Sequence, residues 1–179
     1  MTLVYLMPLG QVAPVVLDVM SAAIERAFGL PSTIGPGLRD IAYAFDRTRN
    51  QYHVSKLLME IIKDPPSDAR RIVGVTEADL FLPIFTFVFG EAQLQGLGAI
   101  LSTYRLHNEF YGLRHDPPLY AERIEKETVH ELGHTFGLVH CYDPVCVMRS
   151  STYVEDVDQK SAEFCSSCRT KLSERFSRR

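Results

Sequence analysis

The spacing of apolar residues changes repeatedly along the first part of the chain, and each change predicts a new strand or helix. Thr2 to Met7 is a short, mostly apolar run, which predicts a buried strand that ends at Pro8. Apolar residues then recur at helical spacing from Pro14 to Phe28, and Gly29 stands where the helix would stop. We therefore expect a strand followed by a helix.

The same alternation continues through the middle of the chain. Asn50 to Lys63 carries a wide apolar stripe at helical spacing, which predicts a second helix. Arg71 to Thr76 is typical of a central strand, and two more strands are expected at Ile84 to Glu91 and at Ala99 to Leu106. Strands and helices in this order predict an α/β (α+β) fold with a twisted mixed sheet.

A longer helix is predicted after these strands. Asp116 is a suitable N-cap, and Pro117 fits the first turn because its missing N–H needs no partner there. The pattern runs to Phe136, and Gly137 can end the helix because glycine readily adopts a positive φ. This helix carries most of the candidate chemistry.

Two histidines of this helix indicate a metal site. His130 and His134 are four residues apart, so both imidazoles project from one side, about one turn apart. Val129, Leu132 and Phe136 fall largely on the opposite side. A helix with an apolar face and a histidine face is expected at the floor of a cleft.

Three further residues complete the pattern HELGHTFGLVH. Glu131 lies about 100° around the helix from His130, away from direct ligation and near a water held by the metal, where a general base should sit. A sharp turn at Gly137 would bring His140 round as the third nitrogen ligand. Three protein ligands and one open position are typical of catalytic zinc. The alternative is a chance match with core histidines, and the added glycine and third histidine make such a match far rarer.

The cysteines of the chain form a second candidate metal site. Their spacing, C-x4-C, eighteen residues and C-x2-C, resembles that of a structural zinc site, although the first gap is wide. Four thiolates leave no open position, so this zinc would be structural and would hold a small C-terminal lobe. Disulfides are the alternative, and they would require an oxidising compartment or a thermophilic host. The residues are Cys141, Cys146, Cys165 and Cys168, and the first directly follows His140.

Composition and charge exclude several other classes of protein. The 179 residues suffice for one domain, and a net charge of -3 gives no strongly basic field for nucleic acid. The C-terminal tail is basic, so a zinc-knuckle nucleic-acid protein stays as a weaker alternative. The longest apolar run, Leu80 to Gly90, is too short to span a bilayer, and no basic residue precedes Arg26 as a secretory signal requires. We therefore expect a cytoplasmic protein with no nucleic-acid or membrane partner.

Together these motifs resemble a known group of enzymes. HELGHTFGLVH resembles the extended zinc signature of the metzincin clan of metallopeptidases, and its combination with the cysteines is similar to the archaemetzincin family. The resemblance implies a metzincin-like lobe with an active-site helix and a small zinc-pinned C-terminal lobe. It also implies two zinc ions per chain: a catalytic zinc on His130, His134 and His140 with Glu131 as base and proton shuttle, and a structural zinc on Cys141, Cys146, Cys165 and Cys168, with Met148 as the Met-turn residue.

The segment after Met148 both follows and departs from the family pattern. Val157, Asp158 and Lys160 match residues usual in the family. Where the family tends to have a Phe-Ser-Asn-Ser-Leu type stretch, however, this chain has residues 150–154 as Ser-Ser-Thr-Tyr-Val. The adjoining substrate pocket is therefore expected to differ in shape. Without the resemblance, Met148 would be interpreted as ordinary core packing.

Several other residues keep two interpretations. Tyr142 and Tyr153 lie close enough in sequence to donate a hydrogen bond to the oxyanion of a hydrolysis reaction, although packing is the commoner role of tyrosine. His53, His107 and His115 have no partner at metal-ligand spacing. We expect these three to be surface or core histidines.

The sequence as a whole predicts a zinc-dependent metallopeptidase that hydrolyses peptide bonds. Residues 1–179 would form a single catalytic domain, with an N-terminal α/β subdomain of residues 1–137 and a C-terminal subdomain of residues 138–179. The expected partner is a peptide or small protein that pairs with an exposed edge strand, for which Ile84 to Glu91 is the candidate unless that strand is internal. A monomer is expected. The alternative function is a non-catalytic or dormant zinc-containing peptide-binding module.

Overall fold

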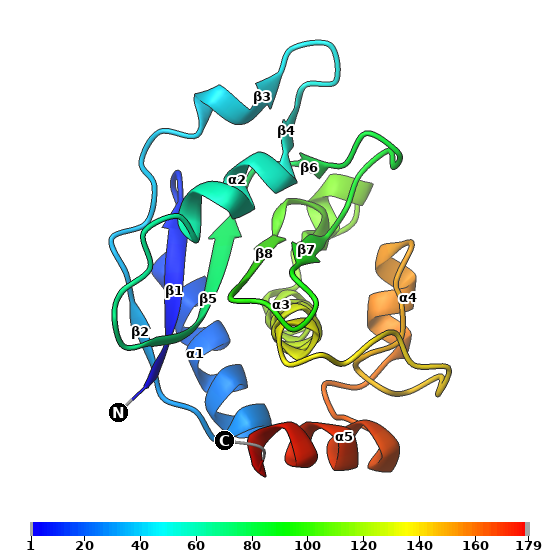
Figure 1. The fold of residues 1–179 in the computed structure, drawn as a ribbon. Coiled ribbons are helices and arrows are strands. Elements are labelled where there is room, and N and C mark those ends of the chain that lie inside the picture. Colours follow the sequence, from blue (N-terminus) through cyan, green and yellow to red (C-terminus); the bar gives the residue numbers. More distant parts are fainter. Residues whose placement is uncertain (1, 178–179) are drawn as a thin grey trace.

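A five-stranded sheet forms the centre of the molecule. The computed structural model describes residues 2–177, and the strands lie in the order β2-β1-β5-β8-β7 (Figure 1). β1 (Leu3–Leu9), β2 (Ser32–Ile34), β5 (Ala69–Thr76) and β8 (Gly98–Ser102) run parallel, and β7 (Gly90–Ala92) runs antiparallel to β8. The predicted mixed sheet is therefore confirmed, and β7 forms one of its edges.

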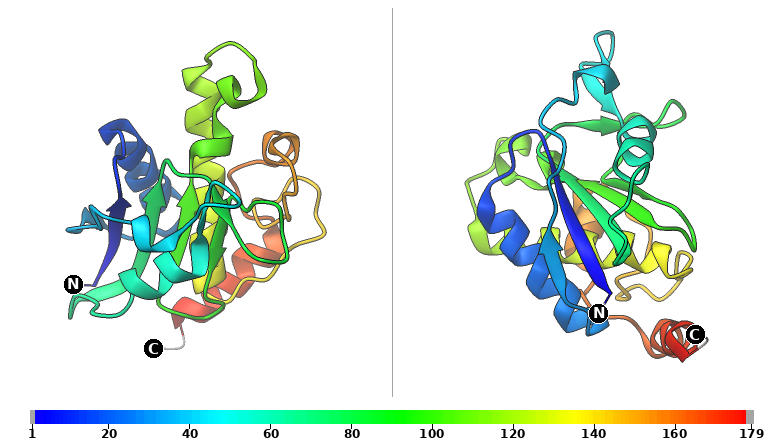
Figure 2. Two further views of the ribbon diagram at one scale, coloured as in Figure 1. Left: turned by 90° about the horizontal axis from the view of Figure 1, so that it is seen from above. Right: turned by 60° about the vertical axis from the view of Figure 1, so that its left-hand side comes forward.

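Helices cover both faces of this sheet. α2 (Val54–Ile61) packs on one face, in a core that includes Ile72 and Ile100. α1 (Pro14–Phe28) and α3 (Pro117–Thr135) pack on the other face, and Figure 2 shows the sheet between the two helical layers. Because both faces are covered, the central strands are almost continuously apolar, as is usual for parallel sheets.

The chain after α3 packs back onto the layer formed by α1 and α3. It contains α4 (Val154–Gln159) and α5 (Ser166–Ser177), joined by loops. Phe164 packs edge-on against Phe28 of α1, with ring centroids 5.5 Å apart. Buried apolar residues of this segment belong to the same core as α1, α3 and the sheet. This shared core holds the segment against α3.

A smaller, three-stranded sheet lies at one end of the molecule. It consists of β3 (Phe45–Asp46), β4 (Gln51–His53) and β6 (Leu80–Phe81), in the order β3-β4-β6. Three short 3-10 helices, Ala42–Ala44, Tyr104–Leu106 and Asn108–Tyr111, connect the larger elements. Within residues 2–177, no helix combines the length and the apolar character that crossing a bilayer requires.

Two of the predicted helices begin and end where their caps place them. α1 spans Pro14–Phe28, and Gly29 follows it with φ of 62°, the left-handed conformation that favours glycine. α3 begins at Pro117, and the side chain of Asp116 accepts a hydrogen bond from the Leu119 N–H at 3.1 Å. The helix ends at Thr135, with Phe136 as its C-cap residue. Both predictions are confirmed.

Two element boundaries predicted from the sequence are wrong. β1 continues through Pro8 to Leu9, because β2 ends opposite Leu6 and the missing N–H of proline is not needed beyond that point. The segment from Asn50 to Lys63 is not one helix, since Gln51–His53 form β4 and only Val54–Ile61 are helical. Asn50 has φ of 55° and turns the chain between β3 and β4.

The two strands predicted before α3 are also shorter than expected. Of Ile84 to Glu91, only the last two residues belong to a strand, β7, because side chains from elsewhere bind the preceding backbone. Of Ala99 to Leu106, β8 takes the part up to Ser102. The Ser102 hydroxyl then accepts a hydrogen bond from the Tyr104 N–H at 3.1 Å, where a 3-10 turn begins.

Candidate metal centres and cleft

The end of α3 turns sharply, as the sequence predicts. Gly137 has φ of 88°, and its N–H donates to the His134 carbonyl at 2.8 Å. The Leu138 N–H donates to the Gly133 carbonyl at 3.1 Å, so two carbonyls at the helix end are satisfied. A side chain at Gly137 would also meet Gln95, since an added Cβ would lie 2.6 Å from its Cγ. The turn directs the following residues back over the helix.

His130, His134 and His140 come together on one side of α3. Their candidate ligand atoms all lie within 4.8 Å of one another, and the Nε2 atoms of His130 and His134 are 3.1 Å apart. The Nδ1 atoms of these two histidines lie 2.8 Å from the Val147 carbonyl and 2.7 Å from the Leu138 carbonyl. Because a carbonyl only accepts, each Nδ1 carries the proton and each Nε2 keeps a free lone pair. This donor set suits a divalent metal such as zinc.

Burial favours the neutral form of all three imidazoles. It is the main cause that lowers the pKa of His130, His134 and His140, and the positive charge of Lys160 lowers it further. His130 is 5% exposed, whereas His140 is exposed. Neutral imidazole is the form that binds a metal. The predicted apolar face of the helix is also confirmed, because Val129, Leu132 and Phe136 are buried.

Glu131 is buried beside the histidines. Its Oε2 atom has no hydrogen-bond partner within the described chain, and its side chain lies against Gly90 of β7. Burial, followed by the negative charge of Glu127, raises the pKa of Glu131 well above its ordinary value. A carboxylate with a free oxygen and a raised pKa suits proton transfer at a reacting centre.

Met148 lies fully buried beneath the histidine site. An added Cβ at Gly133 of α3 would come within 2.6 Å of its sulfur, so the glycine in HELGH leaves the space that Met148 fills. The neighbouring Val147 supplies the carbonyl next to His130. The turn at Met148 thus supports both the helix and one of its histidines.

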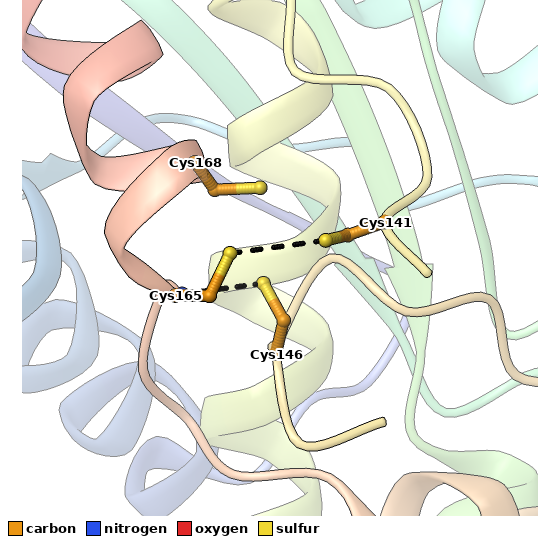
Figure 3. A group of neighbouring side chains, drawn as sticks. All are labelled: Cys141, Cys146, Cys165 and Cys168. Atoms are coloured by element: carbon orange, nitrogen blue, oxygen red, sulfur yellow. Dashed lines mark hydrogen bonds between the residues drawn. The ribbon is translucent and has the colours of Figure 1, made fainter. Parts of the chain in front are cut away.

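The four cysteines gather beside this turn, with all four side chains pointing toward one another (Figure 3). Their sulfur atoms lie within 4.8 Å of one another, and those of Cys141 and Cys165 are 3.8 Å apart. All four are free thiols. The backbone N–H of Cys168 lowers the pKa of Cys165. Two cysteines come from the loop after α3 and two from the start of α5, so a metal here would join these segments.

A cavity of about 550 Å³ lies over the histidine site. Three glutamates, Glu91, Glu127 and Glu131, line it, and the described lining includes no lysine or arginine. The rest of the lining is largely apolar and comes from two stretches of the chain, residues 85–94 and residues 139–153. The departure from the family pattern at residues 150–153 therefore does fall on the cavity wall.

The tyrosines and the other histidines differ in their relation to this cavity. Tyr153 lines it, while Tyr142 is fully exposed and is not among the lining residues. His53 packs on Phe81, and His115 lies against Glu109. Neither these histidines nor His107, which stacks on the ring of Tyr120 at 4.0 Å, joins the triad.

The sequence reasoning missed a buried ion pair at the edge of the cavity. Lys160 Nζ lies 2.9 Å from Glu127 Oε1, and the two side chains are 0% and 3% exposed. Glu127 sits one turn before His130 and Glu131 on α3. Helical spacing places it on the same side as these residues, but no local pattern reveals that a lysine more than thirty positions later lies beside it.

Comparison with known proteins gives a consistent result. The family model described as peptidase family M54 matches residues 16–174. A curated archaemetzincin from Pyrococcus furiosus is 41% identical over 185 residues, covering 98% of this chain and 95% of the relative. Another, from Pyrococcus horikoshii, is 44% identical over 147 residues, covering 80% and 77%.

Solved structures show the same similarity. The crystal structure of archaemetzincin from Methanopyrus kandleri superimposes with a TM-score of 0.87 at 33% identity, covering 99% of this chain and 96% of that one. The archaemetzincin from Archaeoglobus fulgidus, solved in complex with malonate, gives a TM-score of 0.83 at 35% identity, with 95% and 99% coverage. The expected fold class is therefore confirmed.

Proposed function

The chain belongs to peptidase family M54, the archaemetzincins, and we propose that it hydrolyses peptide bonds with Glu131 as the general base. Family membership makes it a zinc metallopeptidase. We assign the catalytic zinc to His130, His134 and His140. The observation that carries this assignment is the convergence of three imidazoles whose ligand atoms lie within 4.8 Å, two of them fixed by backbone carbonyls.

Zinc held there supplies Lewis acidity, which makes water easier to ionise and a carbonyl easier to attack. Glu131 accepts the proton of the attacking water and then delivers it to the leaving amine. Its raised pKa suits this shuttle, because the buried carboxyl holds an accepted proton more firmly than an exposed one. Its unpartnered Oε2 leaves an acceptor ready.

The substrate would bind along β7. This strand lies at the edge of the sheet and borders the cavity, so an extended peptide can add to its free side. β7 replaces the longer edge strand, Ile84 to Glu91, that the sequence suggested. Tyr153, which lines the cavity, is the remaining tyrosine candidate for contacting a substrate carbonyl, because Tyr142 is fully exposed.

We assign a structural zinc to Cys141, Cys146, Cys165 and Cys168, giving two zinc ions per chain. Residues 138–179 would then form the small C-terminal subdomain of a single catalytic domain, with residues 1–137 as the N-terminal subdomain. We propose that the protein acts as a monomer. Thiols kept for metal binding support a reducing compartment, the cytoplasm.

The decisive variant is Glu131→Gln, which keeps the size of the side chain and removes the base. With wild type and variant loaded to equal zinc content by elemental analysis, we expect kcat on a peptide library to fall by about 10²- to 10⁴-fold. Glu155→Gln, an exposed glutamate of α4, is the matched control and should retain wild-type activity. An inactive, zinc-loaded wild type would favour a peptide-binding module instead.

A further inference from the structure

We propose that Arg49 and Gln51 are positioning residues that fix residues 82–89, the wall loop, and so set the preference of the cleft for bulky apolar substrate side chains. The inference rests on the proposed peptidase function. It concerns residues that lie outside the described lining of the cavity. They would act through the loop, without touching the reacting atoms.

The wall loop has an exposed tip, and part of it lines the cavity. Ile84 and Phe85 are 82% and 53% exposed, although both are large apolar residues. Residues 85–89 nevertheless line the cavity. Backbone hydrogen bonds run from the Phe85 N–H to the Leu82 carbonyl within the loop, and from the Val88 N–H to the carbonyl of Leu80 in β6. The carbonyls at its tip depend on side chains from elsewhere.

Two side chains of the β3–β4 hairpin bind the tip. Arg49 Nη2 donates to the carbonyls of Phe85 at 2.6 Å and Thr86 at 3.2 Å. Gln51 Nε2 donates to the Thr86 carbonyl at 3.0 Å. A charged donor makes a stronger hydrogen bond than a neutral one, so Arg49 is expected to make the larger contribution.

A hydrogen-bond network around the buried Gln51 orients these two donors. Gln51 is 6% exposed, accepts from Arg49 Nε at 3.2 Å and donates to Asp79 Oδ2 at 2.9 Å. Asp79 in turn accepts two hydrogen bonds of 2.7 Å from Arg105. The guanidinium of Arg49 also lies 4.3 Å above the ring of Phe81. These contacts direct both donors toward the carbonyls of Phe85 and Thr86.

The same network supports the inner side of the wall. The guanidinium of Arg105 lies 4.1 Å from the ring of Phe87, and Phe87 packs edge-on against Phe89 at 5.3 Å. Both phenylalanines line the cavity, and so does Tyr153. Together with the three glutamates of the cavity, this wall favours an apolar side chain next to the cleaved bond and disfavours an acidic one.

The test compares Arg49→Gln with Arg47→Gln, an exposed arginine of the same hairpin with no hydrogen bond or ion pair to the described residues. We expect faster amide hydrogen exchange at residues 83–88 in Arg49→Gln alone. For matched peptides with Phe or Ala beside the cleaved bond, the kcat/KM ratio should fall about tenfold, mainly through KM. Arg49→Lys, which keeps a charged donor, should recover part of the ratio.

Two results would overturn the proposal. One is unchanged exchange at residues 83–88 in Arg49→Gln, and the other is faster exchange with an unchanged preference for Phe over Ala. If the wild type cleaves no peptide, the proposed function fails by itself. The ratio of Kd values of the same fluorescently labelled peptides then takes the place of kcat/KM, so the role of Arg49 is still decided.

Discussion

At the scale of single residues, the site depends on two glycines, Gly90 and Gly133, whose lack of a side chain leaves space for their neighbours. An added Cβ at Gly90 would lie 2.6 Å from Glu131 Oε1, and one at Gly133 would lie 2.6 Å from the sulfur of Met148. Neither glycine has a positive φ, so the reason for glycine here is close packing and not backbone conformation. Glu131 and Met148 therefore occupy space that the side chain of any residue other than glycine at positions 90 and 133 would fill.

His107 gives a pH-dependent prediction at the same scale. Burial against Tyr120 lowers its pKa, although Glu109 opposes the shift. The folded protein therefore favours the neutral ring, and as the pH falls below about 6.5 the unfolded chain binds the proton more readily. Stability is present above that pH and is lost as the pH falls towards the folded-state pKa.

We expect His107→Phe, which keeps a ring on Tyr120, to lose less thermal stability than the wild type between pH 7.5 and pH 5.5. The difference in Tm should be on the order of 1 °C. Scanning calorimetry of both proteins at the two pH values measures this difference. Parallel Tm curves for wild type and His107→Phe would contradict the assignment.

At the scale of elements, charged contacts join α3 to the segment after it. Arg123 of α3 donates two hydrogen bonds of 2.7 Å to Asp158 of α4. The buried pair of Lys160 and Glu127 lies next along the same interface. Because these residues are thirty or more positions apart in sequence, they fix the packing of α4 and not the local structure of α3.

We expect Lys160→Met to lower the free energy of unfolding by about 3–5 kcal/mol, because it leaves the Glu127 carboxylate buried without its cation. Adding Glu127→Gln should restore most of the loss, since the remaining amide carries no charge. Urea unfolding of the single and double variants measures both. Lys171→Met, at an exposed lysine of α5, should change stability by less than about 0.5 kcal/mol. A double variant as unstable as Lys160→Met would contradict this account.

The elements that the sequence predicted well are those with local signals. α1 and α3 each begin with a proline. A glycine in the left-handed conformation follows each helix, Gly29 after α1 and Gly137 after α3. Ile84 to Glu91 was predicted as one strand, yet only its last two residues belong to β7. The side chains of Arg49 and Gln51 bind the carbonyls of Phe85 and Thr86 instead. Such partners lie about 35 positions away, and no periodicity within the segment indicates them.

The candidate metal sites were also predictable, for the same reason. His130, His134 and His140 are positioned by one helix and its terminal turn, and the cysteine spacing resembles that of a structural zinc site despite its wide first gap. The cavity above them was not predictable in detail, because its walls join β7 to residues 150–153 through tertiary packing.

At the scale of the whole molecule, the two proposed subdomains should respond differently to metal removal. We expect a chelator to increase amide hydrogen exchange at least tenfold in residues 138–177, where the thiolate site joins two segments, and to leave β1, β5 and β8 protected. Those strands lie in the centre of the large sheet and are covered on both faces. Equal increases in all regions would show that residues 138–177 are not a separate unit. Exchange monitored by mass spectrometry distinguishes the two results.

One peptide bond joins His140, in the histidine triad, to Cys141, in the thiol cluster. A metal ion bound by the four sulfur atoms would restrain the backbone that positions the imidazole of His140, so metal binding at the thiolate site would favour metal binding at the histidine site. Cobalt exchanged into the thiolate position would then serve as a coloured reporter. Its absorption bands should shift when an inhibitor or a second ion occupies the neighbouring centre, which offers an optical way to follow occupancy without any substrate.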